Sequence, residues 1–200
     1  IEDTIDRHPV IVDENLKWLK AIACLTASTT AVVGFVEPRQ GKNNTGKKYF
    51  NSLAIMSDGK IQGIVRKSLL PTYSEFNDYR YIEPSPDVGS QPADTLTHLD
   101  ETNIKKCSKT NTINGLKYGF SICEDCWNNK TFFDSNLYSI DPIDELSREK
   151  PNVFINCSAS PSRAKKEQLK HNMLSYISEN YKTPLVYVNQ VGAIDNSSFD

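Results

Sequence analysis

Runs of apolar residues alternate along the chain with segments that have the periodicity of helices. The apolar runs occupy residues 29–36 (TTAVVGFV), 116–123 (LKYGFSIC), 152–160 (NVFINCSAS) and 184–195 (PLVYVNQVGAID). The helical patterns occupy residues 12–26 and 163–182, and the apolar face of the first consists of Leu16, Leu19, Ile22, Ala23 and Cys24. Strands this apolar are typical of sheets that are buried on both faces. Their alternation with helices predicts an α/β fold in which helices cover sheets.

Residues 49–67 (YFNSLAIMSDGKIQGIVRK) contain Asp58-Gly59 between two apolar stretches. This arrangement predicts a β-hairpin with a two-residue turn. Residues 83–112 are rich in Pro, Ser, Thr and Asp and have little periodicity, so we expect a long surface excursion there. Residues 134–150 are polar and have a partly helical pattern.

The composition excludes several classes of protein. Charged residues make up 24% of the 200 residues, the formal net charge is −2 and the sequence pI is about 6.0. A nucleic-acid binder needs clustered Lys and Arg to neutralise phosphates, so this balance argues against one. No apolar run approaches the roughly 20 residues that span a bilayer, and we expect no membrane segment. The N-terminus lacks both Met and a basic, apolar leader, which indicates a trimmed chain.

The chain has five cysteines, an odd number that favours a reducing, cytoplasmic setting over a disulfide scaffold. Cys123 and Cys126 form one CxxC motif, a spacing that zinc sites and redox proteins share. A zinc site needs a second ligand pair, whereas His8, His98 and His171 stand far apart in the sequence. We therefore expect no metal site.

Two polar residues stand at strand ends and are the candidates for chemistry. Cys123 ends a buried strand and precedes two acidic residues and Trp127, and Lys67 ends the second strand of the hairpin. Reactive groups in α/β folds lie at the carboxyl ends of strands, where the chain turns and exposes backbone N–H groups. The alternatives are that Cys123 is a small core residue and that Lys67 is a solvated strand tip.

A reactive Cys123 would need a cation near its thiol. An unperturbed thiol has a pKa of about 8.5 and is only a few per cent ionised at pH 7. Lowering this pKa by about two units takes about 2.7 kcal/mol of preferential stabilisation of the thiolate, which one nearby ammonium supplies. Neither motif contains a His, so Lys67 is the candidate cation.

Four ordered motifs between residues 67 and 200 resemble those of the nitrilase, or carbon–nitrogen hydrolase, superfamily. They are Lys67–Tyr81 (KSLLPTYSEFNDYRY), Tyr118–Trp127 (YGFSICEDCW), Asn156–Pro161 (NCSASP) and Tyr187–Asp195 (YVNQVGAID). The Ile-Cys-Glu-Asp-x-Trp form is most similar to the glutaminase domain of glutamine-dependent NAD synthetases. This resemblance implies a four-layer α-β-β-α sandwich, with residues 1–200 forming a single, incomplete glutaminase domain that is truncated at both ends.

The resemblance also implies a Cys–Glu–Lys triad. Cys123 would be the nucleophile, and Lys67 would stabilise the oxyanion together with the backbone N–H of Glu124. The Glu that acts as general base in the family would lie upstream of Ile1. The remaining matches are the substrate-binding positions Tyr73, Glu124, Ser160 and Lys166, with Trp127 and Asp78 as supporting residues. Asp78 stands where the family usually has a Glu.

The function that follows from the resemblance is hydrolysis of glutamine, with the ammonia used for ATP-dependent amidation of deamido-NAD to NAD. We expect no cofactor for the glutaminase reaction, and ATP and magnesium for an attached synthetase domain. No Ser-Gly-Gly-x-Asp-Ser phosphate loop occurs in these 200 residues. Glutamine, the synthetase domain and other copies of the protein are the expected partners, without nucleic acid or membrane.

Two alternatives stay open at this point. One is a free-standing amidase of the same superfamily that acts on another ω-amide or carbamoyl compound. The other is a non-catalytic nitrilase-like scaffold that assembles with partners. The residues Glu124 and Trp127 favour the glutaminase over the amidase, and the presence of Cys123 and Lys67 argues against the scaffold.

Overall fold

The computed structural model describes residues 5, 10–39, 46–85, 108–194 and 197–200. The chain forms two compact units, Ile1–Lys109 and Thr110–Asp200, which we describe in turn. Most of the predicted surface excursion, residues 86–107, lies outside the described residues.

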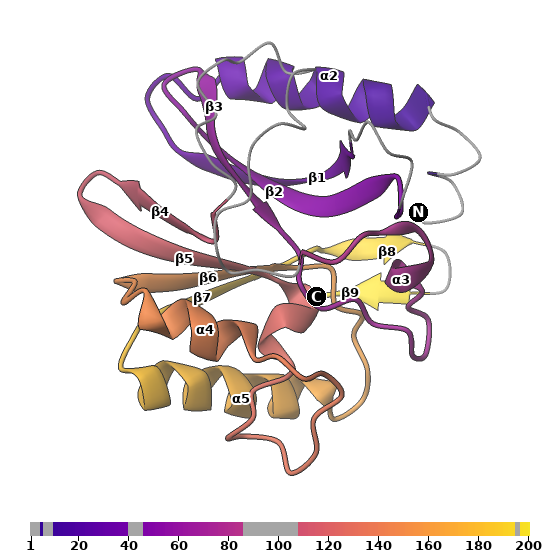
Figure 1. Cartoon of the computed structure of the whole chain (residues 1–200), viewed down its shortest axis with the longest axis vertical. Coiled ribbons are helices and arrows are strands. Elements are labelled where there is room, and N and C mark those ends of the chain that lie inside the picture. Colours follow the sequence, from indigo (N-terminus) through magenta and orange to yellow (C-terminus); the bar gives the residue numbers. More distant parts are fainter. Residues whose placement is uncertain (1–4, 6–9, 40–45, 86–107, 195–196) are drawn as a thin grey trace. The chain divides into compact units, whose positions relative to one another are not determined.

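The first unit is an antiparallel sheet with one helix on its face (Figure 1). Helix α2 (Val10–Cys24) precedes strands β1 (Ala31–Pro38), β2 (Tyr49–Ser57) and β3 (Lys60–Arg66), and β2 is the central strand. The Asp58-Gly59 turn has positive φ at both residues, +54° and +74°, and joins Ser57 to its partner Lys60. Both features are those of a two-residue hairpin turn, so the predicted hairpin is confirmed.

The core of the first unit lies between α2 and the sheet. Leu19 and Ala23 of α2 pack against a group of buried side chains on the strands, which are Phe35, Ala54, Met56, Ile61 and Ile64. Cys24 is exposed, so its assignment to the apolar face of this helix was wrong. Cys24 is the last residue of the helix, where no strand residue of the core cluster covers it.

A side chain of α2 also bonds the free edge of this sheet. The amide of Asn15 donates to the backbone carbonyl of Val36 at 3.1 Å and accepts from the Val36 N–H at 3.4 Å. Val36 lies on β1, which is an edge strand among the described strands of this unit. Asn15 therefore satisfies two backbone groups that a neighbouring strand would otherwise bond.

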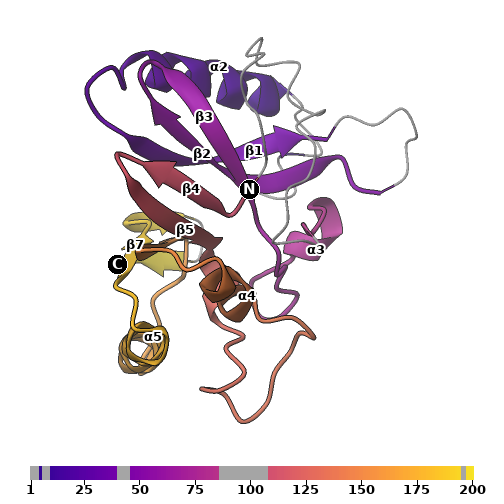
Figure 2. The ribbon, with the colours of Figure 1, turned by 60° about the vertical axis from the view of Figure 1, so that its left-hand side comes forward.

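The second unit has a mixed sheet with the order β4-β5-β6-β7. Its strands are β4 (Thr110–Ile113), β5 (Leu116–Ile122), β6 (Val153–Ser158) and β7 (Leu185–Asn189). Strand β4 runs antiparallel to β5, whereas β5, β6 and β7 are parallel. Helices α4 (Pro142–Arg148) and α5 (Lys166–Tyr181) lie on one face of this sheet (Figures 1 and 2).

The core of the second unit lies between this face and the two helices. Its fully buried members are Cys126, Ile143, Leu146, Phe154, Met173 and Ile177. Gly119 on β5 allows α4 to approach closely, because a Cβ at this position would lie 3.0 Å from the Leu146 side chain and 3.1 Å from Pro151. The predicted α/β class is confirmed, since each unit is a sheet with helices on one face.

The apolar run 184–195 differs from its prediction as one buried strand. Strand β7 ends at Asn189, and the short strand β8 (Gly192–Ile194) pairs instead with β9 (Ser197–Phe199). The side chains of Val186 and Val188 are 48% and 52% exposed. Gly192 has a φ of +120°, a conformation that favours glycine, and the new strand begins at this residue.

Candidate active site

Cys123 occupies a sharp turn at the carboxyl end of β5. The strand ends at Ile122, and Cys123 begins the short 3₁₀ helix η2 (Cys123–Cys126). Its φ of +45° lies in the left-handed region, which costs free energy in any residue with a Cβ. The Asp125 carboxylate stabilises the turn by accepting the Ile122 N–H at 3.1 Å. A strained residue held at the end of a buried strand is characteristic of a functional site.

Cys126, the second residue of the CxxC motif, has a different environment. Its side chain is fully buried in the core of the second unit, and its thiol donates to the Cys123 carbonyl at 3.2 Å. Burial raises the pKa of the Cys126 thiol well above its usual value, and the nearby Cys123, Asp125 and Glu124 raise it further. The Cys123 side chain is 9% exposed. Of the two thiols, Cys123 is the less buried, and it remains the candidate nucleophile.

The backbone of this turn is bonded to the next strand. The Asn156 amide on β6 donates to the Ser121 hydroxyl at 2.9 Å and to the Cys123 carbonyl at 3.5 Å. Ser158 in turn donates to Asn156 at 2.7 Å. The two buried bonds of the Asn156 amide fix the carboxyl ends of β5 and β6 relative to each other.

Glu124, the residue after the nucleophile candidate, is 3% exposed. Its carboxylate accepts a hydrogen bond from the Tyr138 hydroxyl at 3.2 Å. A buried carboxylate has to be hydrogen-bonded to offset the loss of hydration, and this contact contributes to that requirement. Tyr138 was not a candidate from the sequence, because it lies in the polar segment 134–150 without a motif of its own.

Ser160, Lys166 and Trp127 lie in the same unit, after the ends of β5 and β6. Ser160 is 3% exposed and its backbone is bonded by Asn189. Lys166 is the first residue of α5, where its ammonium donates to the Pro161 carbonyl at 3.2 Å and lies 5.4 Å from the centre of the Trp127 ring. The structure thus brings Lys166 and Trp127 together.

Lys67 and Asp78 meet in the first unit. Lys67 follows β3 directly and is 4% exposed, so the alternative of a solvated strand tip is wrong for this residue. Its ammonium forms an ion pair with the carboxylate of Asp78, the first residue of helix α3 (Asp78–Tyr81). Asp78 therefore reaches Lys67 despite a side chain shorter than that of the usual Glu.

A second buried ion pair lies beside Lys67. Arg66 donates to Glu37 through Nε at 2.9 Å and through a second nitrogen at 2.5 Å, and Ser52 donates to the same carboxylate at 2.7 Å. Glu37 is 0% and Arg66 5% exposed. The bidentate pair fixes the end of β3, from which Lys67 extends.

Tyr73 is 42% exposed and packs edge-to-face on Phe76, with ring centroids 5.7 Å apart. Lys109, which is 3% exposed, bonds the Ser68 hydroxyl next to Lys67, a contact that sequence patterns did not suggest. Lys67 and Tyr73 belong to the first unit and Cys123 to the second. The predicted proximity of Lys67 to Cys123 therefore stays a prediction.

Other features of the described segments bear on the type of site. Cys24, Cys123, Cys126 and Cys157 are free thiols. No group of three His, Cys, Asp or Glu residues in these segments is placed to hold a metal ion. The helices in the same part of the chain are all too short or too polar to cross a membrane.

The chain is similar over most of its length to curated proteins that share one name. It is 32% identical to the glutamine-dependent NAD synthetase of Synechocystis over 190 residues, which are 94% of this chain and 30% of that protein. The enzyme of the same name from Thermotoga maritima is 30% identical over 190 residues. The chain is a homologue of glutamine-dependent NAD synthetases. It spans about 30% of the length of these relatives, and no family model matches it.

Solved structures agree with this homology. The glutamine-dependent NAD synthetase of Acinetobacter baumannii, solved with ADP, matches 94% of this chain and 29% of its own with a TM-score of 0.69 and 25% identity. An amidase of the nitrilase superfamily from Nesterenkonia matches all of this chain and 62% of its own with a TM-score of 0.69 and 11% identity. The predicted nitrilase-like fold is confirmed.

Proposed function

We propose that the chain is the glutaminase part of a glutamine-dependent NAD synthetase. In this function the side-chain amide of glutamine is hydrolysed, and the ammonia is used to convert deamido-NAD to NAD. The observation that supports it most strongly is the left-handed turn at Cys123, where a thiol follows a buried strand and begins η2. A nucleophile in this position lies next to backbone N–H groups that can bond an oxyanion.

The reaction consumes water and releases glutamate and ammonia. The general base takes the proton of the Cys123 thiol, and the sulfur attacks the amide carbon of glutamine. As the carbon–nitrogen bond breaks, the protonated base returns this proton to the leaving nitrogen, which departs as ammonia. Water then hydrolyses the resulting thioester and regenerates the thiol. We assign the base to a Glu upstream of Ile1, and oxyanion stabilisation to Lys67 and the Glu124 N–H.

Two charged residues complement the two ends of an amino-acid substrate. Glutamine carries an α-ammonium and an α-carboxylate, which suit the carboxylate of Glu124 and the ammonium of Lys166 respectively. Tyr73 and Ser160 add hydroxyl groups that can bond the same ends. Trp127 supports this region through its contact with Lys166, and Asp78 supports Lys67 through their ion pair.

The proposal includes a synthetase domain attached to this chain in the full-length protein. That domain would use ATP and magnesium, in keeping with the ADP in the homologue from Acinetobacter baumannii. The glutaminase reaction itself would need no cofactor. We further propose that the protein acts in the cytoplasm as a homo-oligomer.

A free-standing amidase is the second candidate function. The solved amidase from Nesterenkonia favours it, because one of its structures shows acrylamide added to an active-site cysteine. Such an enzyme would hydrolyse small amides that have no α-ammonium. These substrates carry no positive charge to complement the buried carboxylate of Glu124. The charge of Glu124 therefore favours glutamine. A non-catalytic scaffold would have no need of the strained Cys123.

The deciding experiment measures NAD synthesis by the full-length protein with glutamine or with free ammonia as nitrogen donor. Cys123→Ala should abolish the glutamine-dependent reaction and leave the ammonia-dependent reaction within about twofold. Cys126→Ala, a matched change in the same turn, should retain both activities. Loss of both activities in Cys123→Ala, or glutamine use by that variant, would overturn the proposal.

A further inference from the structure

The segment between η2 and α4, residues 128–141, is anchored by the first residue after Trp127. The Asn128 side chain is buried and bonds both backbone groups of Tyr138, accepting from its N–H at 3.3 Å and donating to its carbonyl at 3.0 Å. It also donates to the Ile140 carbonyl at 2.6 Å. We call residues 128–141 the anchored loop. Asn128 pairs with Tyr138 as a neighbouring strand would, and this fixes the backbone of Tyr138.

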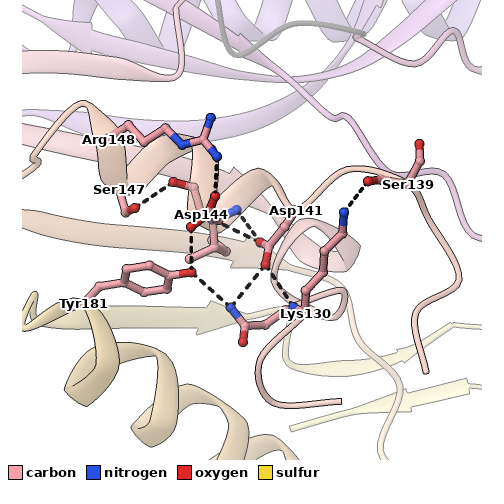
Figure 3. Close-up of polar contacts among 9 residues, drawn as sticks. Lys130, Ser139, Asp141, Asp144, Ser147, Arg148 and Tyr181 are labelled. Atoms are coloured by element: carbon pink, nitrogen blue, oxygen red, sulfur yellow. Dashed lines mark hydrogen bonds and ion pairs between the residues drawn. The ribbon is translucent and has the colours of Figure 1, made fainter. Parts of the chain in front are cut away.

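The other end of the anchored loop is held by Asp141. One of its carboxylate oxygens accepts the N–H groups of Ile143 and Asp144 and so caps α4, and the second accepts the Lys130 N–H at 3.0 Å. Figure 3 shows these contacts together with the bond from Tyr181 to Asp144. Lys130 also bonds the Ser139 carbonyl across the loop. The loop is therefore tied at several points along its length.

The side chain of Tyr138 extends from the anchored loop to the turn that contains Cys123 and Glu124. Its hydroxyl donates to Glu124 at 3.2 Å, and Glu124 lies four residues before Asn128. A closed ring of contacts results. It runs along the chain from Glu124 to Asn128, through the Asn128 amide to the Tyr138 backbone, and through the Tyr138 side chain back to Glu124. Because the Tyr138 backbone is fixed, its hydroxyl restricts the rotamers that the Glu124 carboxylate can adopt.

We propose that Tyr138 is a positioning residue for substrate binding, which holds the Glu124 carboxylate toward the α-ammonium of the amino-acid substrate. This inference rests on the glutaminase function proposed above. A carboxylate that is already oriented binds a cation without losing further side-chain entropy. Tyr138 therefore acts on the Michaelis constant through Glu124 and leaves the bond-breaking step to Cys123.

Kinetics of the full-length protein test this role. Tyr138→Phe should raise KM for glutamine about tenfold through loss of a hydrogen bond to a charged group, with kcat changed less than about threefold. Ammonia-dependent synthesis should stay within about twofold. Tyr118→Phe, the same chemical change on β5, is the control and should leave KM unchanged. An unchanged KM in Tyr138→Phe, or equal losses in both synthetic reactions, would overturn the proposal.

A double-mutant cycle tests whether Tyr138 acts through Glu124. In the Glu124→Gln background, Tyr138→Phe should change KM less than about twofold, because the oriented charge is already gone. An undiminished tenfold effect in that background would contradict the mechanism.

Amide hydrogen exchange tests the ring independently of any activity. Tyr138→Phe should speed exchange in residues 123–128 relative to wild type, whereas Tyr118→Phe should not. Unchanged exchange rates in residues 123–128 of Tyr138→Phe would contradict the ring of contacts. If wild type proved unable to hydrolyse glutamine, the glutaminase function would fail, while faster exchange would still support the contact.

Discussion

The side-chain amide of Asn189 pairs with the backbone of Ser160. Its oxygen accepts the Ser160 N–H at 2.9 Å, and its nitrogen donates to the Ser160 carbonyl at 3.0 Å. Asn189 is the last residue of β7, and Ser160 follows the end of β6. One side chain therefore fixes the segment that presents Ser160 to the candidate site.

Removal of this amide should affect both stability and substrate binding. We expect Asn189→Ala to lower the free energy of unfolding by about 1–3 kcal/mol, since both backbone groups of Ser160 and the Asp200 carbonyl lose a partner. The KM for glutamine should rise by severalfold because Ser160 becomes less ordered. Urea unfolding and steady-state kinetics measure the two effects.

Asn15→Ala is the matched control for this variant. Asn15 also bonds both backbone groups of one residue, Val36, but lies in the first unit on α2. It should lose stability to a similar extent while its KM for glutamine stays unchanged. A similar rise in KM in both variants would show that the effect of Asn189 is not local.

The two cysteines of the CxxC motif should differ in reactivity. A chloroketone analogue of glutamine should alkylate Cys123 in the native protein and leave Cys126 unmodified, because Cys126 is fully buried and its pKa is raised. Peptide mass spectrometry locates the label. In denaturant both thiols should react with iodoacetamide, which controls for detection of the Cys126 peptide. Native labelling at Cys126 would reverse the assignment of the nucleophile.

The ion pair between Lys67 and Asp78 should matter for stability. Asp78→Asn should lower the free energy of unfolding by about 3 kcal/mol, because the buried ammonium of Lys67 loses this carboxylate. In Lys67→Met/Asp78→Asn neither charge remains, and most of that loss should be recovered. Urea unfolding of wild type and both variants measures the difference. A double variant less stable than Asp78→Asn would contradict this account.

Charge alone should not replace Lys67 in catalysis. Lys67→Arg keeps the positive charge but has a planar, wider head group, so it should fold and lose most glutamine hydrolysis. Ammonia-dependent synthesis in the full-length protein should persist. Full glutaminase activity in Lys67→Arg would remove Lys67 from the proposed triad.

Alkaline pH should destabilise the second unit through Tyr181. Burial and the charge of Asp141 raise the pKa of Tyr181 to about 12, from 10.0 in the unfolded chain. Between these values the unfolded state has lost a proton that the folded state retains, so the free energy of unfolding falls as pH rises from about 10 to 12. Tyr181→Phe should make this dependence shallower in urea unfolding.

Tyr187 provides a comparison, because burial raises its pKa to about 12 as well. Tyr187→Phe should reduce the slope over the same range, and the two changes together should reduce it further. The compared quantity is the slope of the free energy of unfolding against pH. A constant loss of stability from the hydrogen bonds that Tyr181→Phe removes does not change this slope. An unchanged slope in Tyr181→Phe would show that its phenol titrates alike in both states.

Much of the fold could be predicted from local patterns. Asp58-Gly59 between apolar stretches predicts its hairpin because few residues other than Gly, Asn and Asp adopt the required turn. The break after Asn189 was not predicted, since the apolar run 184–195 has no proline after Pro184 and no charged residue before Asp195. The pairing of β8 with β9 depends on a tertiary contact that periodicity does not encode.

The candidate site, like the fold, could be predicted only in part. The positions of Cys123 and Lys67 after strand ends could be predicted, because each follows an apolar run in the sequence. The contact between Tyr138 and Asn128 could not be predicted, because it joins residues 10 positions apart through the side-chain geometry of a loop. The ion pair of Asp78 with Lys67 likewise depends on where α3 begins.

The positive φ of Cys123 has a consequence for the descent of this chain. Glycine would relieve the strain at this position, so Cys123→Gly should be more stable than Cys123→Ala. A cysteine is retained there at a cost in stability as long as selection maintains its chemistry. In a lineage that had lost the reaction, mutation toward glycine at position 123 would be favoured by folding alone. The residue found there in distant descendants would record whether the thiol was still in use.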